Sequence, residues 1–166
     1  MSANIHATCV LIGPAGAAFG APAHAGILLK GPTGSGKSSL ALRLVDRGGT
    51  LVADDRVDLF LDGTTLAARA PRALAGLLEI RGVGIVELPH APSAHIALVV
   101  ELVELGLVAR LPEPERYAPP PSLNLPREYW PPLMRLNASE SSAVARIAAA
   151  VAAHAHGRFR HVCPAE

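Results

Sequence analysis

The sequence predicts an α/β fold: a single P-loop domain in which a mixed sheet is flanked by helices. Short apolar segments typical of strands are interspersed with segments typical of helices. The chain has 166 residues, a length typical of one domain, and 50% of them are hydrophobic but only 4% are aromatic. Residues 31–38 (GPTGSGKS) fit the phosphate-binding pattern G-x-x-x-x-G-K-[ST] and stand between a predicted strand and a predicted helix.

Eight segments are predicted to be strands because they are short, apolar and bounded by turn-forming residues. In chain order they are residues 7–12, 25–30, 50–53, 57–61, 64–68, 82–88, 95–105 and 133–136. The first two are expected to form a hairpin across the Gly/Pro/Ala connection at 13–23. Asp62-Gly63, between the fourth and fifth, is a strong signal for a second hairpin.

Three segments are predicted to be helices, at residues 39–45, 71–78 and 139–156. The first leaves the glycine-rich loop and stops at Gly48-Gly49. The second has Pro71 in its first turn, and the third is rich in alanine, with Ser139 as its N-cap. Residues 111–132 hold eight of the fifteen prolines, so we expect an irregular surface segment there that is a lid, an interaction segment or a connector.

Composition excludes several classes of function. The net charge is +1 and there is no basic run, which argues against a nucleic-acid-binding surface. No apolar stretch is long enough for a membrane span, and the N-terminus lacks the features of a signal peptide. Cys9 lies in an apolar strand and is predicted to be a packed thiol. The spacing between Cys9 and Cys163 is not that of a pair of metal ligands. We therefore expect a cytoplasmic protein.

The glycine-rich loop predicts an ATP-type ligand with Mg²⁺. Its glycines let backbone N–H groups point at phosphate oxygens, and the helix that follows directs its positive end at the same anion. Lys37 is expected near the β- and γ-phosphates, and the Ser38 hydroxyl at Mg²⁺. The residues expected to bind the nucleotide are Gly31, Pro32, Thr33, Gly34, Ser35, Gly36, Lys37, Ser38 and Ser39.

Two acidic positions are candidates for the remaining chemistry. Asp54 and Asp55 end a predicted strand whose end faces the loop if the two strands are parallel neighbours. Adjacent side chains on an extended chain point to opposite sides, so one of the two can face metal or substrate. The alternative is an Asx turn. Glu79 is a second candidate metal ligand, or else part of a surface cluster with Arg81. His6, taken alone, is more typical of a residue with no catalytic role.

Four of these segments, in the same order, resemble the catalytic domain of HPr kinase/phosphorylase, a bacterial enzyme that acts on a serine of the phosphocarrier protein HPr. They are the His-containing residues 4–7, the loop and helix at 31–44, residues 47–57 with their VADD run, and residues 77–85 with their EIRG run. The resemblance covers about residues 4–88 and the last strand and helix. It implies a fold of the HPr kinase/phosphoenolpyruvate carboxykinase-like type.

The resemblance also implies roles for single residues. Lys37 and the loop amides would hold the phosphates of ATP, and Ser38 and Glu79 would sit at Mg²⁺. Asp55 would be the base that takes the proton of the target serine, and the acid in the reverse reaction. Asp54 and His6 would form a supporting pair that tunes this centre.

The resemblance implies an ATP- and Mg²⁺-dependent serine kinase that regulates carbon metabolism through phosphotransferase signalling. It does not decide whether the chain also has phosphorylase activity. This chain looks like a short form of the family, without its N-terminal domain. The Pro-rich residues 111–132 occupy the region of the family's basic loop, and the available arginines are Arg116 and Arg127 within this stretch and Arg135 just after it. The family forms a ring-shaped hexamer, so the resemblance is compatible with a homo-oligomer. The alternatives are a small-metabolite P-loop kinase and a nucleotide-sensing regulatory module without useful turnover.

Overall fold

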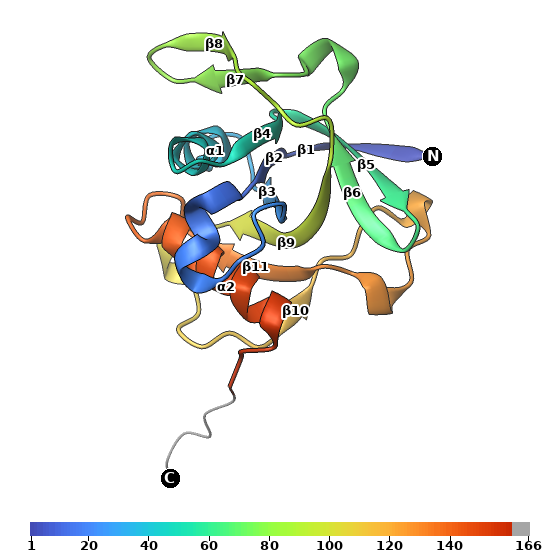
Figure 1. Ribbon diagram of the computed structural model, residues 1–166, viewed down its shortest axis with the longest axis vertical. Coiled ribbons are helices and arrows are strands. Elements are labelled where there is room, and N and C mark those ends of the chain that lie inside the picture. Colours follow the sequence, from blue (N-terminus) through green and yellow to red (C-terminus); the bar gives the residue numbers. More distant parts are fainter. Residues whose placement is uncertain (161–166) are drawn as a thin grey trace.

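The computed structural model describes residues 1–160, and its mixed sheet with flanking helices confirms the predicted α/β class (Figure 1). The helices are α1 (Lys37–Asp46) and α2 (Ala143–His156), with short 3₁₀ helices between strands. The strands are β1 (Ser2–His6), β2 (Thr8–Leu11), β3 (Gly26–Lys30), β4 (Thr50–Ala53), β5 (Arg56–Asp62), β6 (Thr65–Arg69), β7 (Leu77–Ile80), β8 (Gly84–Glu87), β9 (Ala94–Leu102), β10 (Glu115–Arg116) and β11 (Pro132–Leu136). Cys163 lies outside the described residues.

The main sheet has the strand order β1-β5-β6-β9-β3-β2-β4, and β11 adds to it beside β9. The pairs β3–β9 and β9–β11 are parallel, and the other pairs of this sheet are antiparallel. The expected hairpin β2–β3 is present. The condition that β3 and β4 are parallel neighbours is not met, because β2 lies between them. Since β2 is antiparallel to both, β3 and β4 still run in the same direction and end at one edge.

Two hydrophobic cores lie on the two faces of the central strands. Alternation along β3 sends Ile27 and Leu29 into one core and Leu28 into the other. The first core is closed by α1 and α2, whereas the second lies against β5 and β6. The hairpin β7–β8 stands apart at the top of Figure 1 and contacts α1. Neither α1 nor α2 is long and apolar enough to cross a membrane.

Two predicted helices differ from the structure for local reasons. Residues 71–78 hold only the 3₁₀ turn Arg72–Leu74, because Gly76 takes a left-handed φ of 78° and the chain then enters β7. The last helix begins at Ala143 with Ser142 as its N-cap, so the prediction of Ser139 as N-cap was wrong. Ser139 donates its N–H to the side chain of Asn137 instead. The guanidinium of Arg43 binds the carbonyl of Ala138 and also those of residues 140 and 141, which a helix starting at residue 139 would have needed.

The Pro-rich segment 111–132 is irregular as expected, apart from β10 and two 3₁₀ turns, but it is not wholly a surface segment. Tyr117, Leu123 and Leu125 are buried in the second core, against the inner face of the sheet. The ring of Tyr117 also lies under the ammonium group of Lys30, 4.5 Å from the ring centroid. These side chains anchor the segment to the fold between residues 117 and 125, whereas residues 111–116 are exposed.

Cys9 provides a test of the second core. Its thiol is fully buried and free, as predicted, and burial raises its pKa to about 12. Because the thiolate is the reactive form, we expect Cys9 to resist alkylation at pH 8 in the native protein and to react quickly in denaturant. Peptide mass mapping after timed labelling measures this, with Cys163 followed separately. Rapid native labelling of Cys9 would contradict the packing of β2.

Candidate active site

The loop between β3 and α1 closes around the ammonium group of Lys37. This residue is 6% exposed, and its Nζ donates hydrogen bonds to the carbonyls of Gly31 (2.7 Å) and Pro32 (3.0 Å). Burial lowers the pKa of Lys37, and the charges of Asp54 and Asp55 act in the opposite direction. The side chain lines the cleft above the loop, so its charge is held at one point there.

Gly36 fixes the way in which the loop enters α1. It has a φ of 95°, which strongly favours glycine, and it occupies the N-cap position of the helix. A Cβ atom at this position would lie only 2.7 Å from the Cβ of Ala138. The positive φ turns the loop directly into α1, where Lys37 and Ser38 follow, and the close approach to Ala138 leaves no room for a side chain at this position.

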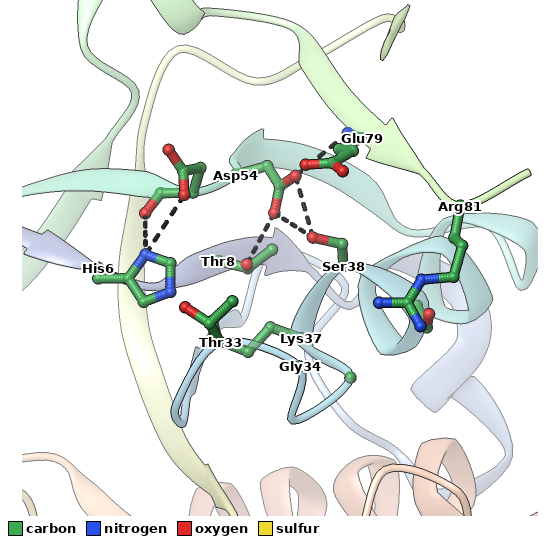
Figure 2. A pocket seen from close by; sticks show the side chains of 12 residues that line it. His6, Thr8, Thr33, Gly34, Lys37, Ser38, Asp54, Glu79 and Arg81 are labelled. Atoms are coloured by element: carbon green, nitrogen blue, oxygen red, sulfur yellow. Dashed lines mark hydrogen bonds and ion pairs between the residues drawn. The ribbon is translucent and has the colours of Figure 1, made fainter. Parts of the chain in front are cut away.

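Asp54, which follows β4, receives hydrogen bonds from three different elements. Its side chain is 5% exposed, and its Oδ1 accepts a hydrogen bond from the hydroxyl of Thr8 on β2 at 2.8 Å. The hydroxyl of Ser38 on α1 lies 2.9 Å from Oδ1 and 3.1 Å from Oδ2. The N–H of Glu79 on β7 donates to Oδ2 at 3.3 Å (Figure 2). One carboxylate thus joins β2, α1 and β7.

Asp55 points elsewhere because the chain turns sharply at this residue. The N–H of Arg56 donates to the carbonyl of Asp54 at 2.7 Å, and Asp55 between them has a φ of 65°, as in a strained three-residue turn. Its side chain is 67% exposed. Nδ1 of His6 lies 2.9 Å from the carbonyl oxygen of Asp55 and 3.3 Å from its Oδ1. His6 therefore pairs with Asp55, and the expected pair of His6 with Asp54 is not formed.

The hairpin β7–β8 contributes two charged side chains to the cleft. Glu79 is exposed on β7, and Figure 2 shows it beside Asp54. Arg81 lies in the turn of the hairpin and also lines the cleft. Within residues 1–160, Arg81 has no ion pair or side-chain hydrogen bond, so the exposed Glu79 and Arg81 are not joined by a direct contact.

The three arginines considered for the family's basic loop, two in the Pro-rich segment and one on β11, do not line the cleft. Arg135 pairs with Glu101 and Glu115, which raises its pKa. Arg116 donates to the carbonyl of Trp130, and Arg127 lies over the Trp130 ring. Arg81 is the arginine that lines the cleft, and it comes from the EIRG segment instead.

The cleft gathers most of the predicted residues around a polar interior, but Gly31, Pro32 and Ser35 do not line it. Its lining residues are His6, Thr8, Thr33, Gly34, Gly36, Lys37, Ser38, Ser39, Asp54, Asp55, Glu79 and Arg81. Two buried side-chain polar atoms in residues 1–160 have no hydrogen-bond partner, Nε2 of His6 and Oγ of Ser35. One belongs to a residue that lines the cleft and the other to the loop. A polar ligand bound in this cleft is the kind of partner that such atoms lack.

The oxygen donors of the cleft fit Mg²⁺. Ser38 Oγ and both carboxylate oxygens of Asp54 lie within hydrogen-bonding distance of each other, and Glu79 lines the same cleft. Residues 1–160 contain no group of three or more His, Cys, Asp and Glu that forms a metal cage. Mg²⁺ is commonly held by one or two carboxylates together with phosphate oxygens and water, and this donor set suits that arrangement.

Sequence reasoning missed Thr8 and Arg81 as site residues. The signal for Thr8 was a hydroxyl inside an otherwise apolar buried strand. The signal for Arg81 was its place two residues after Glu79, which puts it in the turn of the same hairpin.

These features are those of the α/β proteins that bind nucleotide phosphates on a glycine-rich loop at a helix N-terminus. Residues 22–116, more than half of the chain, match the family described as the HPr Serine kinase C-terminal domain. The chain belongs to this family, and the resemblance described from the sequence is confirmed.

Individual relatives match part of the chain. Over 86 residues it is 46% identical to the HPr kinase/phosphorylase of Lactobacillus acidophilus. The aligned segment makes up 47% of this chain and 27% of that protein. The protein of the same name from Pediococcus pentosaceus is 55% identical over 87 residues, covering 52% and 27%. The chain therefore spans about a quarter of the length of these relatives. The solved structure of the Hpr(Ser) kinase/phosphatase from Coxiella burnetii shares the fold, with a TM-score of 0.70, 23% identity and coverage of 92% and 96%.

Proposed function

We propose that this protein is an ATP- and Mg²⁺-dependent serine kinase that acts on the phosphocarrier protein HPr. The observation that carries the proposal is the cleft in which the anchored cation of Lys37 faces two carboxylates held by different contacts. Family membership supports HPr as the substrate, since relatives that share the segment are named HPr kinase/phosphorylase.

In this mechanism, Lys37 and the N–H groups of the loop bind the phosphates of ATP and hold the γ-phosphoryl group in line with the incoming serine. The serine oxygen forms a bond to the γ-phosphorus while the bond from that phosphorus to the bridging oxygen breaks and ADP leaves. Asp55 takes the serine proton, because its carboxylate is exposed and its turn is tied to His6. Arg81 is placed to bind charge on the transferred group.

Mg²⁺, when bound, supplies positive charge that offsets the charge developing on the phosphate oxygens. Ser38 and Glu79 would hold it, and Asp54 would orient the Ser38 hydroxyl. Asp54 and Asp55 then have separate tasks, one at the metal side and one at the serine.

We further propose that residues 1–166 act as one catalytic domain in the cytoplasm and that HPr phosphorylation regulates carbon metabolism. The reverse reaction, attack of phosphate or pyrophosphate on phosphoserine, stays a prediction from the resemblance. A homo-oligomer also stays a prediction, and light scattering in solution tests it.

The decisive experiment is transfer of label from γ-labelled ATP to purified HPr with Mg²⁺. We expect label on one serine of HPr, identified by mass spectrometry, and none on a variant of HPr in which that serine is alanine. ATP binding without any label on HPr would favour the regulatory module. ATP consumption with small alcohols or sugar acids, but not with HPr, would favour the small-metabolite kinase.

A further inference from the structure

Three polar side chains are buried in the part of the chain between residues 1 and 160, and all three line the same cleft. They are Thr8, Lys37 and Asp54. Burying a polar group costs free energy unless its hydrogen bonds are made. Lys37 and Asp54 have tasks in the proposed function, whereas that function does not yet explain Thr8.

Thr8 occupies a position where packing alone would accept an apolar residue. It is fully buried on β2, and its neighbours along the strand, Cys9 and Val10, are fully buried and apolar. Valine has nearly the same shape as threonine, so the hydroxyl is what distinguishes this residue. That hydroxyl has one proton, and it donates it to Oδ1 of Asp54 at 2.8 Å.

Asp54, held by Thr8, in turn fixes the direction of the Ser38 hydroxyl. The Ser38 hydroxyl also has a single proton, and the only acceptors it has in the described residues are the two oxygens of Asp54. While that proton points at Asp54, the lone pairs of Ser38 Oγ are free to face the cleft. A rotation of the Asp54 carboxylate would remove this preference, and the contacts with Thr8 and with the N–H of Glu79 oppose such a rotation.

We infer that Thr8 is a positioning residue for the metal–nucleotide complex: through Asp54 it sets the orientation of the Ser38 hydroxyl (Figure 2). The inference rests on the proposed function, because it takes Ser38 as a metal ligand. Partners that orient a metal ligand typically contribute 10- to 100-fold in metal affinity. Thr8 touches neither metal nor substrate in this arrangement, so its effect is specific to binding that involves the metal.

The test is Thr8→Val, with Thr8→Ser as the matched variant that keeps the hydroxyl. Calorimetry measures the affinity for a non-hydrolysable ATP analogue with and without Mg²⁺. We expect Thr8→Val to weaken binding in Mg²⁺ by about tenfold or more and to leave metal-free binding unchanged, since Lys37 carries that binding. Thr8→Ser is expected to bind like the wild type in both conditions.

A double-mutant cycle with Ser38→Ala separates positioning from a purely structural role. If Thr8 acts through Ser38, Thr8→Val causes no further loss of Mg²⁺-dependent affinity in the Ser38→Ala background. Equal weakening with and without Mg²⁺, or full additivity in the cycle, would overturn the inference. Thermal unfolding checks each variant, and Thr8→Ala replaces Thr8→Val if the latter does not fold. A wild-type protein that binds no nucleotide would overturn the proposed function itself.

Discussion

Replacing Asp55 with asparagine is expected to abolish phosphoryl transfer to HPr while leaving ATP bound. The amide has the shape of the carboxylate but cannot take the serine proton, and loss of a general base typically costs about 10²- to 10⁴-fold in rate. Asparagine also tolerates the positive φ of 65° at this position, so the turn is expected to survive. The measurements are the initial rate of label transfer and the affinity for ATP by calorimetry.

The chain offers a matched control for Asp55→Asn. Asp62 forms a second carboxylate–imidazole contact, with His95 at 2.8 Å, and its side chain is 66% exposed, close to the 67% of Asp55. Asp62 does not line the cleft. Asp62→Asn is therefore expected to keep full transfer. A rate of label transfer within twofold of wild type for Asp55→Asn would contradict the role of Asp55 as the general base.

Local patterns predicted the elements next to the cleft well. The strand at residues 50–53 has the bounds predicted for it, and β3 and α1 flank the loop as the motif required. The signals there are local, because an apolar run bounded by turn residues decides each element. The helix predicted for residues 71–78 was wrong because the Ala/Leu composition there favours a helix, whereas the structure places residues 77–80 in a hairpin with β8.

The contacts inside the cleft depended on information that the sequence pattern does not carry. Alternation predicted that Asp54 and Asp55 point apart, but the partner of His6 is decided by the turn at Asp55. The position of Thr8 under Asp54 depends on β2 lying between β3 and β4, which the predicted strands alone left open. Motif reasoning thus found most residues of the cleft but not Thr8 and Arg81, and the pairing of the residues required the topology.

Replacing Lys37 with alanine is expected to remove most of the affinity for ATP. The side chain supplies a charge held at a fixed point by the carbonyls of Gly31 and Pro32, and a charge-assisted hydrogen bond contributes about 1.5–3 kcal/mol. Several such contacts to phosphates would be lost together, so we expect a loss of at least about 100-fold. Calorimetry with the ATP analogue in Mg²⁺ measures it. Unchanged affinity would contradict phosphate binding by the loop.

Two further variants separate the lost charge from a collapsed loop. Lys37→Met keeps the length of the side chain but leaves the carbonyls of Gly31 and Pro32 without their donor, as alanine does. If Lys37→Ala and Lys37→Met both lose affinity for ATP and both unfold at the wild-type temperature, the charge itself binds the phosphates. Lys30→Met is the matched control, because Lys30 ends β3 next to the loop but lies over the ring of Tyr117 and does not line the cleft. Its ATP affinity is expected to equal that of the wild type, which ties nucleotide binding to the position of the lysine and not to net charge.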